Sequence, residues 1–215
     1  MAWKRSYLFL LVTGLLLGVA LFLFGADISK MDLTRISSRA GWQLPARVME
    51  SLNIESGDHV ADIGAGDGYF SFFLADAVGP SGRVYAVEVE AELVEKLEKT
   101  VREKGLSNVT VVKGNFDDPL LPDGAIDLAF LCHSYHHIEG RSDYFDKLRT
   151  DLALDGRAAI IDLKPTPLVK LLLPSDHWTT KVTMNNEMHL AHYEAVGSFD
   201  FLPGQNFSIY APIRR

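Results

Sequence analysis

Hydrophobic and polar residues alternate along most of this chain with the periods of an α/β domain. Short apolar runs bounded by glycine or charged residues predict buried strands at residues 59–64, 82–89, 108–114, 125–131 and 156–163. Apolar residues spaced three and four apart predict intervening helices at residues 69–78, 91–105 and 142–154. Strands that are apolar on both faces and alternate with helices indicate a doubly wound, mostly parallel sheet.

The two ends of the domain are less regular. Residues 38–54 read as an amphipathic helix that opens the domain. Near the C-terminus, residues 179–196 read as a helix, and residues 199–203 and 206–212 as an antiparallel strand pair. With this pair, we expect an α/β fold with a seven-stranded sheet.

The chain begins with an apolar segment that does not belong to this domain. Tyr7 to Ala26 contains no charged residue, and a helix of that length covers about 30 Å, the thickness of the hydrocarbon core of a bilayer. A cleaved signal peptide is the alternative, but its apolar core is shorter and ends in small residues that are not in register here. We therefore predict a short head at 1–6, a transmembrane anchor at 7–26, a polar tether at 27–38 and the folded domain at 39–215.

Composition and charge exclude some classes of function. The 21 basic and 28 acidic residues give a formal net charge of −7, with no basic run, so a nucleic-acid partner is not expected. Cys132 is the single cysteine, which excludes an internal disulfide. It lies inside a predicted strand and is expected to be a small core residue.

Three glycines follow the first predicted strand, in the stretch VADIGAGDGYF. Gly64, Gly66 and Gly68 lie at the carboxyl edge of the expected sheet, where such folds bind ligands. Glycine there permits positive φ and lets a ligand approach the backbone. A dinucleotide-binding loop would have a third glycine at the position of Tyr69, so a pyrophosphate ligand, and with it a nicotinamide oxidoreductase, is disfavoured.

Several motifs in order resemble one family. VADIGAGDGYF, VYAVEVE, GNFDDPLLPDGAIDLAFL and HSYHHIEG, within residues 40–165, are similar to class I S-adenosylmethionine-dependent methyltransferases, which have a Rossmann-like methyltransferase fold. The resemblance implies S-adenosylmethionine as cofactor. It also implies that Glu88 accepts hydrogen bonds from the ribose hydroxyls, and that Asp117 contacts the adenine amine with Phe116 beside the ring. The methionine part of the cofactor would lie against Asp62 and the backbone of Gly64, Ala65, Gly66 and Gly68.

The chemistry of these residues agrees with that assignment to different degrees. A carboxylate at the end of the second strand, such as Glu88, suits a neutral diol and would repel the 2′-phosphate of NADP. An ordinary solvated carboxylate is the alternative for Glu88. For Asp117 the alternative is stronger, because the Asp118–Pro119 pair that follows it also makes a loop of this kind.

The candidate catalytic residues follow the fourth strand, in CHSYHHIEG. The family faces its methyl acceptor there, so Tyr135, His136 and His137 are the candidates. Either histidine can accept a proton near neutral pH, if the acceptor must lose one. The segment can equally serve to shape the pocket and cover the cofactor.

The same histidines raise the question of a metal site. His133, His136 and His137, together with His189 and His192 at helical spacing, have no carboxylate or thiolate that completes a recognised ligand pattern. We therefore expect no metal. The absence of further cysteines also counts against an arsenite methyltransferase.

The acceptor is the least defined part of the prediction. Residues 164–188 resemble nothing that identifies a substrate, and specificity in such folds lies in variable segments. The run PLVKLLLP within this segment is apolar enough to dock on a membrane surface. Together with the predicted anchor, it favours a lipid-like, quinone-like or other membrane-associated acceptor over a free metabolite. A catalytically degenerate, membrane-tethered cofactor-binding module is the alternative function.

The orientation of the predicted anchor rests on two opposing arguments. Lys4 and Arg5 before the span favour a cytoplasmic N-terminus, which would export the domain. Lys30, Arg35 and Arg39 after the span favour the opposite orientation. Because S-adenosylmethionine is made and kept in the cytosol, we expect a single-pass protein with its domain on the cytosolic side.

Overall fold

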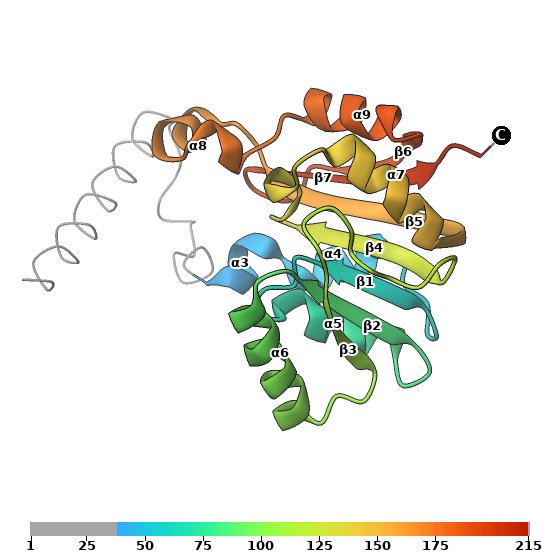
Figure 1. The fold of residues 1–215 in the computed structure, drawn as a ribbon. Helices are drawn as coiled ribbons and strands as arrows, with labels where there is room; N and C mark the ends of the chain where they lie inside the picture. The colour runs from blue at the N-terminus through green and yellow to red at the C-terminus, as the bar shows by residue number, and fades with distance from the viewer. Residues whose placement is uncertain (1–37, 215) are drawn as a thin grey trace, which may run out of the picture. The chain divides into compact units, whose positions relative to one another are not determined.

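The predicted strands form one seven-stranded sheet in the order β3-β2-β1-β4-β5-β7-β6 (Figure 1). Parallel pairing joins the first five of these strands, and β7 is antiparallel to both β5 and β6. The sheet is therefore mixed. Its strands are β1 His59–Ile63, β2 Arg83–Glu88, β3 Val109–Lys113, β4 Ile126–Cys132, β5 Leu152–Leu163, β6 Tyr193–Phe199 and β7 Gln205–Pro212.

The computed structural model describes residues 38–214. Residues Gln43–Arg215 form one compact unit. The α-helices of the described part are α3 Arg39–Gln43, α4 Pro45–Leu52, α5 Tyr69–Val78, α6 Ala91–Lys104, α7 Arg141–Asp151, α8 Pro167–Leu172 and α9 Lys181–Leu190. Two 3-10 turns, η2 Tyr135–His137 and η3 Ser175–His177, follow β4 and α8.

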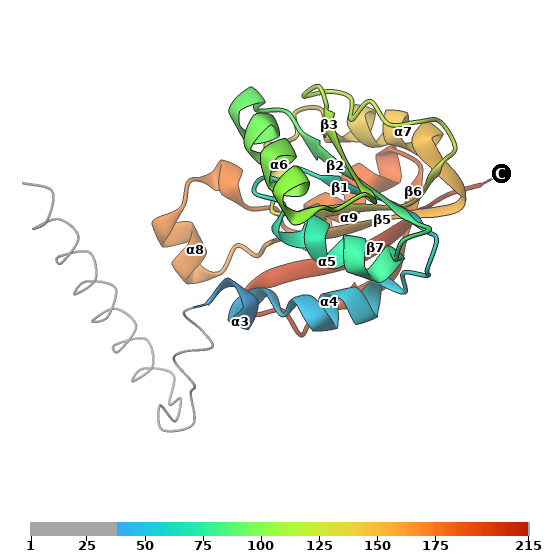
Figure 2. The same cartoon turned by 90° about the horizontal axis from the view of Figure 1, so that it is seen from below.

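Helices cover both faces of the sheet within this unit, as a doubly wound fold requires. On one face α4, α5 and α6 bury apolar side chains such as Leu52, Leu74 and Leu97 against the strands. On the other face α7 and α9 bury Phe145 and Met184 in a second cluster. Figure 2 shows α4 and α5 on the side of the sheet opposite α7. The carboxyl ends of the parallel strands are left to loops, which is where a ligand site forms in such folds.

The C-terminal region differs from the prediction. The helix expected over residues 179–196 ends at Leu190, and Tyr193–Phe199 is instead strand β6. Ala191 ends the helix, and His192 has a positive φ of 64°, which reverses the chain direction. The strand predicted over residues 206–212 is confirmed as part of β7, but the strand predicted over residues 199–203 is wrong, because residues 200–204 form the turn between β6 and β7.

Two further boundaries also differ. The helix expected over residues 38–54 is interrupted at Leu44, whose φ of 44° separates α3 from α4. The cause is Pro45, because proline disfavours the helical conformation in the residue before it. The helix expected to reach residue 154 ends at Asp151, and β5 begins at Leu152 rather than at Gly156.

The predicted anchor Tyr7–Ala26 and the tether lie outside the described residues, except for Ser38. Among residues 38–214, no helix combines the length and the apolar character needed to cross a bilayer.

Candidate functional site

The glycine loop folds over the end of β2. Gly64, Gly66 and Gly68 have φ values of 77°, 57° and 81°, in the left-handed region that favours glycine. The N–H groups of Gly64 and Ala65 both donate to the carbonyl of Val87, at 2.9 and 3.0 Å. The loop is thus fastened to the neighbouring strand by its backbone.

The three glycines meet different surroundings. A Cβ atom on Gly64 would lie 2.4 Å from the Cβ of Ser134, whereas a Cβ on Gly66 would have no atom within 4 Å. A Cβ on Gly68 would lie 2.6 Å from Leu97 of α6. Gly64 and Gly68 are thus required by packing, and Gly66 lies beside open space.

Glu88 is the last residue of β2 and is almost fully buried. Its Oε2 accepts a hydrogen bond from the N–H of Gly66 at 2.9 Å. Its Oε1 accepts from Val89 and Glu90, at 2.7 and 3.1 Å. These three amides fix the orientation of the carboxylate at the wall of a cavity.

That cavity has a volume of about 480 Å³ and lies at the carboxyl edge of the parallel strands. The volume is within the range of small-molecule sites, ~300–1,000 Å³. Its walls come from the ends of β1, β2 and β4, the segment after β3, and the starts of α6 and α7. The lining residues are Ile63, Gly64, Glu88, Val89, Glu90, Leu93, Asn115, Phe116, His133, Ser134, His137, Ile138 and Tyr144.

The predicted adenine contacts divide into two groups. Phe116 lines the cavity and is 70% exposed, so its ring is available to a ligand. Asp117 is not among the lining residues; its Oδ2 pairs with the ammonium of Lys147 at 2.8 Å. The hydrogen bond and the charge of Lys147 lower the pKa of Asp117. Asn115, which the sequence did not single out, supplies a polar side chain to the wall instead.

Asp62 and Ala65 also lie beside the cavity rather than in its wall. The Asp62 carboxylate is 3% exposed and accepts a hydrogen bond from the hydroxyl of Ser71 at 2.6 Å. This contact ties β1 to the first turn of α5. Ala65 is buried in the same core as α5. The contacts predicted for these two residues with a cofactor stay predictions.

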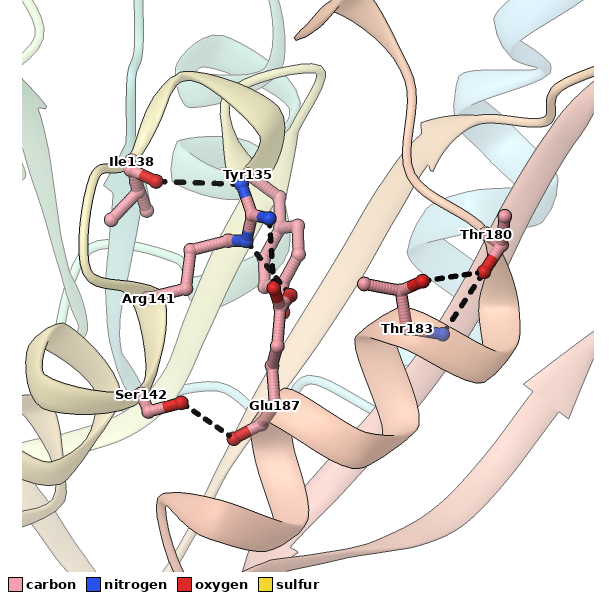
Figure 3. Close-up of polar contacts among 7 residues, drawn as sticks. All are labelled: Tyr135, Ile138, Arg141, Ser142, Thr180, Thr183 and Glu187. Atoms are coloured by element: carbon pink, nitrogen blue, oxygen red, sulfur yellow. Dashed lines mark hydrogen bonds and ion pairs between the residues drawn. The ribbon is translucent and has the colours of Figure 1, made fainter. Parts of the chain in front are cut away.

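Tyr135 points into the protein core. Its side chain is fully buried, and its hydroxyl donates to Glu187 of α9 at 2.7 Å (Figure 3). Burial, and then the Glu187 carboxylate, raise the pKa of Tyr135 far above its ordinary value. The hydroxyl therefore stays protonated and acts as a hydrogen-bond donor, an environment that favours a structural role over proton abstraction.

Arg141 completes this network. Its Nε and Nη2 donate to the two carboxylate oxygens of Glu187, both at 2.8 Å, and its guanidinium lies over the Tyr135 ring (Figure 3). Burial would raise the pKa of Glu187, but the hydrogen bonds from Arg141 and Tyr135 hold it below its ordinary value. The bidentate pair joins the start of α7 to α9. It thereby fixes the position of the segment that carries His136 and His137, called the histidine segment below.

His136 and His137 have different environments. His136 Nδ1 lies 2.6 Å from Oδ1 of Asp162, and the His136 side chain is 5% exposed. Asp162, near the end of β5, is fully buried. His137 is exposed and lines both the 480 Å³ cavity and a second, polar cavity of about 720 Å³. On the predicted acceptor side, the His136 imidazole is thus held by Asp162, and the His137 imidazole is exposed.

The other predicted histidines lie apart from His136 and His137. His133 pairs with Gln205 at 2.7 Å, and His189 and His192 lie at the end of α9, beside a different cavity. His177 of η3, which the sequence analysis did not consider, lies beside His136 and His137. The spacing of about 40 residues between the two segments gives no local signal of this approach.

Comparison with known proteins identifies the kind of domain that carries this cavity. Residues 60–156 match the family model described as "Methyltransferase domain". A solved S-adenosylmethionine-dependent methyltransferase from Aquifex aeolicus superposes with a TM-score of 0.72 at 24% identity, over 87% of this chain and 99% of that one. Residues 60–156 thus form a methyltransferase domain, and the fold is that of class I S-adenosylmethionine-dependent methyltransferases.

Curated relatives of the methyltransferase domain match over a shorter segment. A protein-L-isoaspartate O-methyltransferase of Methanococcus aeolicus is 40% identical over 70 residues, which is 33% of this chain and 32% of the relative. A demethylmenaquinone methyltransferase of Anoxybacillus flavithermus is 34% identical over 79 residues, 37% of this chain and 33% of the relative. The matched segment thus spans about a third of each relative's length.

The family implies S-adenosylmethionine as cofactor, and the cavity of the methyltransferase domain fits this molecule. Glu88 lines the cavity with a carboxylate of the kind that suits a diol, Phe116 offers an exposed ring surface, and Gly64 contributes backbone without a side chain to the wall. Gly66 does not line the cavity, but its N–H donates to the Glu88 carboxylate, and an added Cβ would meet no atom within 4 Å.

The first prediction concerns Glu88. Replacement by alanine removes the acceptor for the ribose hydroxyls, so Glu88→Ala should weaken S-adenosylmethionine binding by about 1.5–3 kcal/mol, the range for hydrogen bonds to a charged group. Calorimetric titration measures this. Glu95→Ala is the matched control, since Glu95 is exposed on α6 and outside the cavity. Unchanged affinity in a folded Glu88→Ala protein would remove Glu88 from the site.

The second prediction compares glycines. Gly66 and Gly105 both have positive φ and open space around an added Cβ, but Gly105 caps α6 away from the cavity. Gly66→Ala and Gly105→Ala should each cost about 1–2 kcal/mol of stability from backbone strain. Only Gly66→Ala should also weaken cofactor binding, by about tenfold or more, because its methyl enters ligand space. If both variants bind S-adenosylmethionine with equal affinity, the space beside Gly66 is filled by solvent and not by the ligand.

Proposed function

We propose that this chain transfers a methyl group from S-adenosylmethionine to a small-molecule or membrane-associated acceptor of lipid-like or quinone-like character. The observation that carries the proposal is the cavity at the carboxyl edge of the sheet. One wall has Gly64 and Glu88, which suit the cofactor, and the other has His133, Ser134 and His137, which suit an acceptor.

Bound S-adenosylmethionine supplies an electrophilic methyl group on a sulfonium, which a nucleophile displaces in line. The protein's own contribution is alignment and exclusion of water, and positioning alone can provide effective molarities of about 10⁵ M or more. Glu88 and the loop backbone would fix the donor. The Arg141–Glu187 pair would hold the histidine segment against the acceptor.

The acceptor class rests on two observations. Leu171 and Leu172 of α8 and the adjacent Leu173 are exposed, so the loop region that varies between such enzymes presents an apolar surface. The demethylmenaquinone methyltransferase relative acts on a quinone-type molecule by its name. Because that match covers about a third of the relative, the quinone-like acceptor is a proposal for this chain.

The third prediction tests both the activity and the acceptor side. Detergent-solubilised protein incubated with isotopically labelled S-adenosylmethionine and membrane extract should yield a labelled product, which mass spectrometry can identify. His137→Ala should lower turnover by more than it lowers cofactor affinity, because His137 lines the wall of the 480 Å³ cavity that would face the acceptor. His189→Ala, on the exposed end of α9, is the matched control.

Two outcomes would contradict the proposal. Cofactor binding without any methylated product from membrane or soluble extracts would favour a degenerate, tethered cofactor-binding module. Label recovered only in a water-soluble product would retain the methyltransferase and remove the membrane-associated acceptor.

The anchor and the cytosolic orientation are further parts of this proposal. The uncharged segment Tyr7–Ala26 is long enough to span a bilayer, and the donor is a cytosolic molecule. The exposed leucines that follow Lys170 provide an apolar surface of the kind that lies on lipid.

The fourth prediction concerns this topology. Protease added to intact cells or spheroplasts should leave the domain undigested, and the same protease should digest it after the membrane is permeabilised. The protein should also sediment with membranes after a carbonate wash. Digestion of the domain from outside would overturn the orientation, and release by carbonate would overturn the spanning anchor.

A further inference from the structure

Three imidazole rings converge next to the cofactor cavity. His136 and His137 come from η2, and His177 ends η3. The ring centroids of His136 and His137 are 4.1 Å apart, and that of His177 lies 5.9 and 5.8 Å from them. One ring nitrogen of each histidine lies within 4.8 Å of one ring nitrogen of the other two.

We propose that His136, His137 and His177 bind a divalent transition-metal ion, with zinc as the ion of choice. Neutral imidazole is a preferred ligand of zinc and its neighbours in the first transition row. Three protein ligands leave a fourth position for water or a ligand oxygen, which is the arrangement of reactive rather than structural zinc sites. From the sequence we expected no metal, on the basis of five histidines that did not include His177.

The pairing of His136 with Asp162 supports this assignment. Histidines that bind metals usually donate their second ring N–H to a carboxylate or a carbonyl, which fixes the ring and increases its basicity as a ligand. His136 Nδ1 lies 2.6 Å from Asp162 Oδ1, so Nε2 is the nitrogen left to bind an ion.

The surroundings of Asp162 add a further observation. The residue is fully buried, and its Oδ2 has no hydrogen-bond partner in the part of the chain that the structure describes. A buried polar atom without a partner is costly. A cation bound to the His136 imidazole would interact favourably with this carboxylate.

Two of the three rings have no competing role. Within residues 38–214, no hydrogen bond to another residue occupies the side chain of His137 or His177. Both rings therefore have ring nitrogens available to an ion.

The geometry requires a small adjustment. Zinc–nitrogen bonds of ~2.0–2.1 Å in a tetrahedral site separate ligand nitrogens by about 3.4 Å. The nitrogens lie within 4.8 Å at present, so a shift of roughly 1 Å closes the site. His137 is exposed and free to rotate toward the held ring of His136.

The surroundings favour a cation. The polar cavity of about 720 Å³ beside the three rings is lined by the carboxyl-bearing residues Glu139, Asp143 and Asp176. His137 also lines the cofactor cavity, so the fourth coordination position would face the side from which an acceptor enters. An oxygen-bearing ligand is the class that such a position takes.

The test uses the full chain in detergent, treated with chelator and then dialysed. Titration with Zn²⁺ against a chromophoric chelator should give one tight site per chain. Co²⁺ in its place should give the visible absorption of a tetrahedral nitrogen site. His177→Ala should weaken Zn²⁺ binding by at least about tenfold, and Asp162→Asn by about 10–100-fold, the usual effect of losing an outer-shell carboxylate.

Controls separate this site from surface binding and from misfolding. His189→Ala should bind Zn²⁺ as the wild type does, and His177→Gln, with melting curves for every variant, covers the case in which His177→Ala does not fold. A wild-type chain without a tight site, or a folded His177→Ala and His177→Gln pair with unchanged Zn²⁺ affinity, would overturn the assignment. S-adenosylmethionine binding measured on the same chelated protein is independent, so failure of the metal site and failure of the proposed function are distinguishable.

Discussion

The close approach of Gly64 to Ser134 is the constraint on which the site depends. An added Cβ at Gly64 would lie 2.4 Å from the Ser134 Cβ, and the Ser134 hydroxyl donates to the carbonyl of Ile63 at 2.6 Å. The ends of β1 and β4 are therefore joined through the Ser134 side chain, which has room only because residue 64 has no side chain of its own. This contact brings the glycine loop, and with it Glu88, next to the segment that carries His136 and His137.

Charged groups then fix the two sides of the cavity in different ways. On the cofactor side, Glu88 is held by three backbone amides, so the orientation of its carboxylate follows from the loop. On the acceptor side, side chains from distant elements hold one another, as in the pair of Arg141 and Glu187 and that of His136 and Asp162. The first arrangement is local in sequence, and the second depends on the tertiary fold.

This difference explains how much could be predicted from the sequence. Five strands, three helices and the glycine loop follow from local periodicity, because buried strands and helices each leave a repeat in the chain. Glu88 follows from its place at a strand end. His177 approaches His136 and His137, and Asp162 is buried against His136. These residues lie far apart in the chain, so no local sequence spacing predicts their contacts. Strand β6 was read as helix because an edge strand with one buried residue in seven has a weak alternation.

The segment between β5 and α9 is attached to the sheet mainly at its two ends. Lys164 donates its backbone N–H to the carbonyl of Gly204, and the carbonyl of Thr179 accepts from the side-chain amide of Asn206 in β7. The side chains that form the two buried clusters of the sheet lie outside residues 164–178. Residues 164–178 can therefore vary without disturbing the two buried clusters, which lets the surface of this segment change while the glycine loop and Glu88 stay in place.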